Sequence, residues 1–195
     1  SKLLGLIDQA AQLGVERFVL DDGWFCGRND DKSSLGDWWA DTKKLPRGLT
    51  PLVEACSRNE MEFGLWVEPE MVSPDSDLYR SHPDWILSHE SAPQLLARHQ
   101  LVLDLARPEV EAYIFDSLSA LLSQHPIRYL KWDMNRDIHQ AGNALGHPAV
   151  SGQTRALYRL LNRVKTAFPE VEIEGCASGG GRGDCGVLNY VSRFW

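Results

Sequence analysis

Acidic side chains follow apolar stretches of the sequence at the points where the strands of an α/β protein would end. Asp21 and Asp22 close the stretch FVLDD, and Asp133 closes the stretch IRYLKWD. Glycoside hydrolysis usually needs two carboxyl groups around the scissile bond, one as nucleophile or base and the other as acid. Asp133 is our candidate for the nucleophile, because Lys131 points to the same side of a strand and its ammonium favours the ionised carboxylate. The alternative is a structural ion pair of Asp133 with Lys131 or Arg136.

The pair Asp21 and Asp22 is suited to binding a sugar. Ionised carboxylates accept hydrogen bonds from hydroxyl groups and can accept two at once. Trp24 and Trp66 can offer apolar faces to the C–H groups of a sugar ring. An ordinary turn into Gly23 is the alternative explanation for the two aspartates.

Other polar and aromatic residues near the expected strand ends have a structural explanation that we prefer. Glu68 and Glu70 close the stretch EFGLWVEPE, and we expect ion pairs with arginines rather than contacts with a substrate. Trp38 and Trp39 either pack within a loop or stack on an outer sugar, and we expect loop packing. Cys176 is expected to be a thiol in a pocket wall.

Strands and helices alternate along the chain. Helical spacing of apolar residues begins at Leu3 and ends at Gly14. Thr50 as N-cap and Pro51 at the first helical position indicate the start of another helix. The apolar pattern predicts strands at 16–24, 62–70, 100–106 and 127–133, and in 171–181 a strand that runs into a glycine loop. It predicts helices at 3–13, 50–61, 107–125 and 151–168.

This alternation is typical of an α/β protein with a parallel sheet, whose strands are buried on both faces. Because several strands end on polar residues, and one site receives loops from several strands in such a barrel, we predict a (β/α)8 TIM barrel. The chain has 195 residues and about five βα units, fewer than a complete barrel needs. We therefore expect residues 1–195 to be a partial catalytic barrel domain. A doubly wound sheet would need a glycine fingerprint after its first strand, and DDGWFCGRN is not one.

Composition excludes several classes of partner. The net charge of −7 argues against binding to nucleic acid or to an anionic membrane surface. No stretch reaches the roughly 18 apolar residues that a membrane span requires. The four cysteines show no CxxC spacing, which favours reduced thiols in a cytoplasmic protein over disulfides or a zinc site. The histidines show no HExxH spacing, so no metal is expected.

Five segments together resemble the successive motifs of the α-galactosidases in glycoside hydrolase family 36. These segments are FVLDDGWF, GLWVEPEM, LVLDLARPEV, YLKWDMNR and CASGGGR, and they occur in the order of the family. The resemblance implies a (β/α)8 catalytic barrel and a retaining double displacement without a metal or an organic cofactor.

The resemblance also implies roles for particular residues. Asp133 corresponds to the catalytic nucleophile, Asp21 and Asp22 to the residues that hold galactose O4 and O6, and Trp66 to a wall of the galactose pocket. The remaining implied contacts to the sugar are Arg98, Lys131, Asn135, Cys176 and Gly179. The acid/base of the family would lie beyond Trp195, and Asp184 does not correspond to it. The first barrel strand and an N-terminal β-domain would also lie outside this chain.

The function that we expect is that of a retaining exo-α-galactosidase. It would hydrolyse terminal α-1,6-linked galactose from oligosaccharides of the melibiose and raffinose type. A galactosyl transferase similar to raffinose or stachyose synthase is one alternative, and a non-catalytic sugar-binding fragment is another. The expected partners are small-molecule galactosides, with neither nucleic acid nor a membrane, and the full-length protein is expected to be a homo-oligomer.

Overall fold

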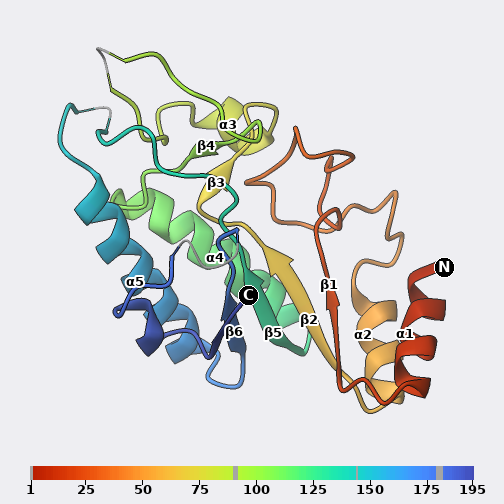
Figure 1. The fold of residues 1–195 in the computed structure, drawn as a ribbon. Helices are drawn as coiled ribbons and strands as arrows, with labels where there is room; N and C mark the ends of the chain where they lie inside the picture. The colour runs from red at the N-terminus through yellow and green to blue at the C-terminus, as the bar shows by residue number, and fades with distance from the viewer. Residues whose placement is uncertain (1, 90–91, 144, 179–181) are drawn as a thin grey trace.

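A parallel sheet of five strands forms the centre of the protein (Figure 1). The computed structural model describes residues 2–89, 92–143, 145–178 and 182–195. The strands are β1 (Arg17–Leu20), β2 (Glu62–Val67), β5 (Ile127–Trp132), β6 (Glu172–Gly175) and β7 (Arg193–Phe194), which lie side by side in this order. The sheet confirms the predicted α/β class. The described residues form an open sheet, and its closure into a barrel stays a prediction.

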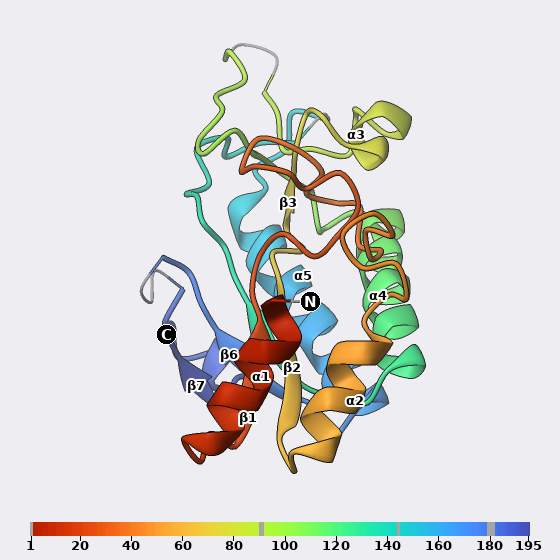
Figure 2. The ribbon, with the colours of Figure 1, turned by 90° about the vertical axis from the view of Figure 1, so that its right-hand side faces the viewer.

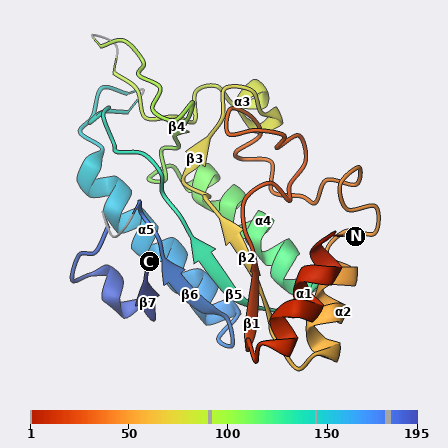
Figure 3. The same cartoon turned by 45° about the vertical axis from the view of Figure 1, so that its right-hand side comes forward.

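Helices cover the sheet. They are α1 (Lys2–Gln12), α2 (Thr50–Arg58), α4 (Pro108–Gln124) and α5 (Val150–Ala167), and a 3-10 turn, η1 (Val187–Asn189), precedes β7. Helices α4 and α5 pass behind the sheet in Figure 3. Helix α4 buries Val110, Ile114, Leu118 and Leu121, which recur at intervals of three and four residues along one side. This spacing places the apolar side chains in one stripe that packs on the sheet.

The other face of the sheet lines a cavity of about 750 Å³. Charged side chains of different strands meet on this face: Arg17 on β1 pairs with Glu62 on the neighbouring β2 and with Glu172 on β6, across β2 and β5. Arg193 on β7 also pairs with Glu172. The guanidinium of Arg17 lies 4.2 Å from the ring centroid of Tyr129 on β5. Ion pairs and a cation–π contact therefore link the strands on the face that the helices leave uncovered.

A cap of loops and short elements lies above the carboxyl ends of the strands (Figures 1 and 2). It contains β3 (Met71–Val72), α3 (Asp77–Ser81) and β4 (Leu101–Val102), and β3 and β4 form an antiparallel pair. Helix α3 begins after Ser76, whose side chain accepts a hydrogen bond from the N–H of Tyr79. The cap is the part of the chain that separates β2 from its helix α4.

The prediction that 100–106 is a strand of the central sheet is wrong. Only Leu101 and Val102 are extended in a ladder, and they pair with the cap strand β3. The segment is apolar because the cap buries it, and an apolar run does not reveal which strand it will pair with. The fifth parallel strand is instead β7, which is too short to show a pattern in the sequence.

Two further details complete the comparison with the predicted elements. The N-cap role of Thr50 is wrong, because helix α2 begins at Thr50 and the flanking Leu49 makes no side-chain capping bond. Pro51 is the second residue of the helix, one position later than predicted, and still lies in its first turn. In the part of the chain that the structure describes, no helix is long and apolar enough to cross a membrane.

The pairing of β2 with β5 contains an irregularity. Phe63 lies opposite Ile127, but the next residue, Gly64, lies opposite Tyr129, so that Arg128 has no partner in the ladder. A Cβ atom at Gly64 would approach Val19 at 3.0 Å and Tyr129 at 3.1 Å. Glycine is therefore needed for the close approach of the three strands at this point.

Candidate active site

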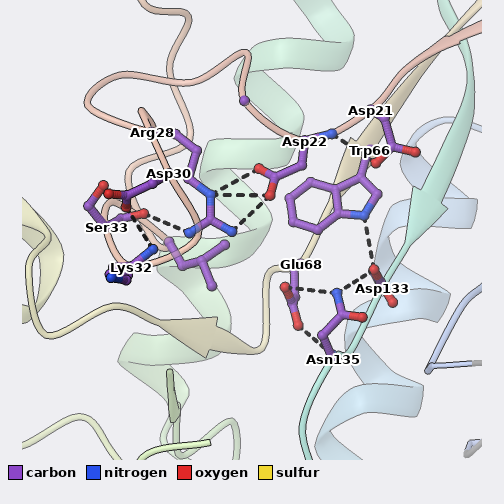
Figure 4. Close-up of polar contacts among 12 residues, drawn as sticks. Asp21, Asp22, Arg28, Asp30, Lys32, Ser33, Trp66, Glu68, Asp133 and Asn135 are labelled. Atoms are coloured by element: carbon purple, nitrogen blue, oxygen red, sulfur yellow. Dashed lines mark hydrogen bonds and ion pairs between the residues drawn. The ribbon is translucent and has the colours of Figure 1, made fainter. Parts of the chain in front are cut away.

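Side chains from four neighbouring strands meet at the carboxyl end of the sheet. Asp21 directly follows β1, Trp66 belongs to β2, Asp133 directly follows β5, and Cys176 directly follows β6. In parallel α/β folds this end of the sheet is where ligands bind. Figure 4 shows the central contacts of this group.

Asp133 is only 5 % exposed and lies where several hydrogen-bond donors converge. Its carboxylate accepts hydrogen bonds from the indole N–H of Trp66 at 3.0 Å and from the backbone N–H of Met134 at 2.8 Å. The side-chain amide of Asn135 donates a further, short bond (Figure 4). These donors approach the carboxylate from the strand β2 and from the chain that directly follows Asp133, and they fix its orientation.

Cys176 completes the surroundings of Asp133 on the side of β6. Its thiol hydrogen-bonds to Asp133, and the thiol is buried. Burial, and then the bond to Asp133, raises the pKa of Cys176 to about 12. The group is therefore a neutral donor toward Asp133 at neutral pH, and its place in the wall of a sugar pocket stays a prediction.

The ion pair of Asp133 with Lys131 or Arg136 is not found. Lys131 pairs with Asp21 at 2.9 Å instead. Burial by itself would lower the pKa of Lys131, but the hydrogen bond and the charge of Asp21 outweigh burial and raise it. Arg136 donates to main-chain oxygens, including that of Leu95 at 3.0 Å. Among the described residues, no lysine or arginine forms an ion pair with Asp133.

Asp22 has a different partner from Asp21. The guanidinium of Arg28 binds the Asp22 carboxylate through both Nε, at 3.0 Å, and Nη2, at 2.8 Å (Figure 4). Arg28 is 4 % exposed, and its Nη1 donates to the main-chain oxygen of Ser33. Our sequence analysis missed Arg28, since one arginine in a loop rich in Asp and Gly has no spacing that would single it out. The two aspartates are thus oriented by two different cations rather than by a simple turn.

Trp66 is an internal residue of the site. Its ring is 2 % exposed and lies parallel to that of Phe25, with 6.3 Å between the ring centroids. Trp24 donates its indole N–H to the main-chain oxygen of Trp66 at 2.9 Å, and Trp38 packs beside it. The predicted loop packing is confirmed for Trp38, which is buried, whereas Trp39 is exposed.

Glu68 is fully buried beside Asp133 and was expected to pair with an arginine. It accepts hydrogen bonds from the backbone N–H of Asn135, from the Asn135 side-chain amide at 3.2 Å and from Gln100 at 3.2 Å. Burial, together with the charge of Asp133, raises the pKa of Glu68 to about 7 despite the bonds from Asn135 and Gln100. The prediction of an arginine partner is wrong for Glu68.

The arginine partner that we expected is found at Glu70. Arg182 donates from both terminal nitrogens to the Glu70 carboxylate, which also accepts from the indole N–H of Trp132 at 3.0 Å. The two glutamates at the end of β2 therefore differ. Glu70 is neutralised by an arginine, and Glu68 is held by amide groups alone.

The structure gives no support for the sugar contacts that the resemblance implies at Arg98 and Gly179, for two different reasons. Arg98 is exposed, has a φ of 51°, and forms no side-chain hydrogen bond or ion pair with another described residue. Gly179 lies outside the described residues. Within the described ranges, no group of three or more His, Cys, Asp and Glu residues is arranged to hold a metal ion.

Comparisons with known proteins show the family to which the chain belongs. A family model described as Melibiase matches residues 1–195. Alpha-galactosidase of Escherichia coli is 53 % identical over 193 residues, which cover 99 % of this chain and 27 % of that protein. The crystal structure of the GH36 alpha-galactosidase AgaB from Geobacillus stearothermophilus has a TM-score of 0.96 and 45 % identity, covering 100 % of this chain and 28 % of that one.

A variant of AgaA from the same organism, in complex with raffinose, has a TM-score of 0.95 and 44 % identity, covering 100 % of this chain and 28 % of that one. This chain therefore spans little more than a quarter of the length of these relatives. The resemblance to family 36 α-galactosidases is confirmed, and the chain belongs to the melibiase family.

Proposed function

We propose that this chain is part of the catalytic barrel of a retaining, exo-acting α-galactosidase. The observation that carries the proposal is the environment of Asp133, a buried carboxylate on which donors converge and which forms no ion pair within the described residues. A nucleophile must be ionised and yet free to form a bond, and a lysine or arginine bound to it would oppose both bond formation and the approach of the sugar. Since the chain spans 27 % of its relatives, we call the longer protein that would carry it the parent enzyme.

In the proposed reaction, an oxygen of Asp133 attacks the anomeric carbon of galactose and forms a galactosyl ester. The bond to the leaving oxygen breaks, and an acid beyond Trp195 protonates that oxygen. The same group, now a base, removes a proton from water, which attacks the anomeric carbon and releases the Asp133 carboxylate. When the Asp133 carboxylate is released, the N–H groups of Trp66 and Met134 would donate hydrogen bonds to its negatively charged oxygens.

The substrate class rests on the polar side chains around Asp133. Lys131, Asp21 and Asp22 offer a cation and two partly exposed carboxylates, which suit the hydroxyl groups of a sugar. We propose that Asp21 and Asp22 hold O4 and O6 of galactose, and that Asn135 and Cys176 lie near O2. Arg98 and Gly179 would contribute further contacts, and Trp66 would support the pocket wall. The raffinose complex of the AgaA variant supports α-1,6-linked galactosides as substrates.

The proposal extends to the surroundings of the parent enzyme. Four free cysteines support a reducing compartment such as the cytoplasm. The net charge of −7 supports neutral galactosides as partners rather than nucleic acid. The expected homo-oligomer belongs to the parent enzyme, and light scattering would test it.

Covalent trapping tests the proposal. The parent enzyme is treated with a mechanism-based α-galactosyl inactivator, and peptide mass spectrometry locates the adduct. We expect a galactosyl adduct on Asp133, and none on Asp133→Asn protein that still binds galactose. An adduct on another residue, or no adduct on folded protein that binds galactose, would overturn the nucleophile assignment. Product analysis with raffinose in water, with and without added sugar acceptor, separates hydrolysis from the alternative galactosyl transfer.

A further inference from the structure

Glu68 is a buried carboxyl group for which the proposed reaction has no use. No substrate atom needs to reach it, because Asn135 lies between it and Asp133 (Figure 4). Burial of an acidic group without a cation is costly. The groups that Glu68 binds therefore indicate its role.

The side-chain amide of Asn135 bridges two carboxylates. One Nδ2 hydrogen is directed to Asp133, and Nδ2 also lies 3.2 Å from Glu68 Oε2. The amide oxygen faces the other way and accepts from the Ser178 hydroxyl at 3.4 Å. If the amide were rotated by half a turn, its oxygen would face both carboxylates and repel them. The two carboxylates together therefore select one orientation of Asn135.

Resting on the proposed function, we propose that Glu68 is a positioning residue: it holds the Asn135 amide with its N–H groups toward Asp133 and thereby orients the nucleophile. A second bond supports this arrangement, because the other Glu68 oxygen accepts the backbone N–H of Asn135. Glu68 thus holds Asn135 by both its main chain and its side chain.

The role requires an ionised Glu68. All three groups that hydrogen-bond to it are N–H donors, two from Asn135 and one from Gln100. The charged groups around it are Asp133 after β5 and Arg136, whose guanidinium donates to the main-chain oxygen of Gln100. Glu70, two residues along the chain, is neutralised by Arg182. A proton on Glu68 would occupy one oxygen and displace a donor.

Glu68→Gln is the variant that separates the charge from the shape. The glutamine has one acceptor oxygen in place of two, so its own N–H group would face an N–H donor of Asn135 or Gln100. Asn135 then loses its fixed orientation. The readouts are the rate constant for trapping of Asp133 by an activated α-galactosyl fluoride, which needs little acid assistance, and the affinity for galactose.

We expect Glu68→Gln to lower the trapping rate constant of the parent enzyme by about 10- to 100-fold, as for loss of a hydrogen bond to a charged group. Galactose affinity should fall less than the trapping rate constant, because only the proposed contact of Asn135 near O2 is disturbed and Asp21, Asp22 and Lys131 are unchanged. In the wild type the trapping rate should fall as the pH drops through about 7, and this step should disappear in the variant. The trapping rate constant of Glu68→Asp, which keeps the charge, should lie between those of the wild type and Glu68→Gln.

A double-mutant cycle shows whether Glu68 acts through Asn135. In an Asn135→Ala background, Glu68→Gln should cost much less than in the wild type, because the residue through which it acts is gone. Equal losses in both backgrounds, or a parallel loss of galactose affinity, would overturn the inference. So would a trapping rate within about twofold of the wild type in folded Glu68→Gln protein.

The inference has one test that does not depend on the reaction. A crystal structure of the Glu68→Gln parent enzyme should show Asn135 rotated or displaced from Asp133. An unmoved Asn135 would refute the positioning role even if the enzyme proved to have another activity. Conversely, failure to trap Asp133 in the wild type, with Asn135 displaced in the variant, would count against the proposed function and leave the positioning role standing.

Discussion

The ammonium of Lys131 lies 2.9 Å from the carboxylate of Asp21, although the two residues are 110 positions apart in the chain. Lys131 is on β5 and Asp21 follows β1, and these strands lie on opposite sides of β2. The pair therefore spans the end of β2. Lys131 forms its ion pair with Asp21, and the groups that hydrogen-bond to Asp133 are the neutral donors Trp66, Met134, Asn135 and Cys176.

The first prediction concerns this pair. Lys131→Met in the parent enzyme should weaken galactose binding by about 10- to 100-fold, since a charged hydrogen-bond partner of the sugar and of Asp21 is lost. Because the Asp21 side chain is 61 % exposed, stability should change by less than about 1 kcal/mol. Calorimetric titration measures the affinity. Arg107→Met, which breaks a surface pair with Asp84, is the control and should bind galactose normally.

The second prediction concerns the indole of Trp66. Trp66→Phe keeps an aromatic ring against Phe25 but removes the N–H that donates to Asp133. The rate of galactosyl transfer to Asp133 should fall about 10- to 100-fold, as expected for one hydrogen bond to a charged group. Single-turnover kinetics measure this step. Trp38→Phe removes an indole N–H that bonds to no described group, so it should leave the rate nearly unchanged.

The third prediction is a dependence of stability on pH. The pKa of Glu68 is raised from 4.5 to about 7 in the folded chain, so its charged form is disfavoured by folding. The contribution of Glu68 to the free energy of unfolding is fully present below pH 4.5 and is lost as the pH rises through 7. The loss amounts to about 3 kcal/mol, from a shift of roughly two and a half pKa units.

Urea unfolding of the chain at several pH values measures this loss. Glu68→Gln should lack it, so the difference in unfolding free energy between wild type and variant should change by about 3 kcal/mol between pH 4.5 and 8. Glu54→Gln, on the exposed side of α2, serves as the control. A difference that is the same at every pH would contradict the prediction.

The fourth prediction concerns the reactivity of the cysteines. Burial raises the pKa of Cys56 to about 11 and that of Cys176 to about 12, so neither forms much thiolate at pH 8. Iodoacetamide should therefore modify the exposed Cys185 much faster than either of them. Mass spectrometry of tryptic peptides after timed quenching follows the modification. Rapid labelling of Cys176 in the folded chain would show that its contact with Asp133 opens readily.

The positions of the carboxylates were predictable because strand ends are visible in the sequence. An apolar run that stops at Asp133 places this residue at the carboxyl end of a strand, whatever its neighbours in space are. The partners were not predictable in the same way. Lys131 is two residues from Asp133 and alternates to the same side, but its side chain is long enough to reach Asp21, which is closer in space to its ammonium.

Contacts made by loop side chains were beyond sequence reasoning. Arg28 pairs with Asp22 because the loop after β1 folds back on itself, and no periodic pattern encodes such a fold. Glu68 and Glu70 look alike in the sequence, but they differ because Arg182 reaches only one of them. The cap strand β4 was misplaced for the related reason that an apolar run indicates burial and does not indicate the partner.

The unpaired Arg128 at the start of β5 determines to which face of the sheet each later side chain of that strand points. With this extra residue, Tyr129 lies opposite Gly64 and Lys131 lies opposite Trp66, so that Lys131 and Asp133 alternate onto the face of Trp66. If the chain ran on from Ile127 with Arg128 paired to Gly64, Leu130 would lie opposite Trp66, and Lys131 and Asp133 would turn to the other face of the sheet. Deletion of Arg128 would therefore leave Lys131 opposite Trp66, whereas deletion of Leu130 would bring Lys131 opposite Leu65 and reverse the two faces at the end of the strand.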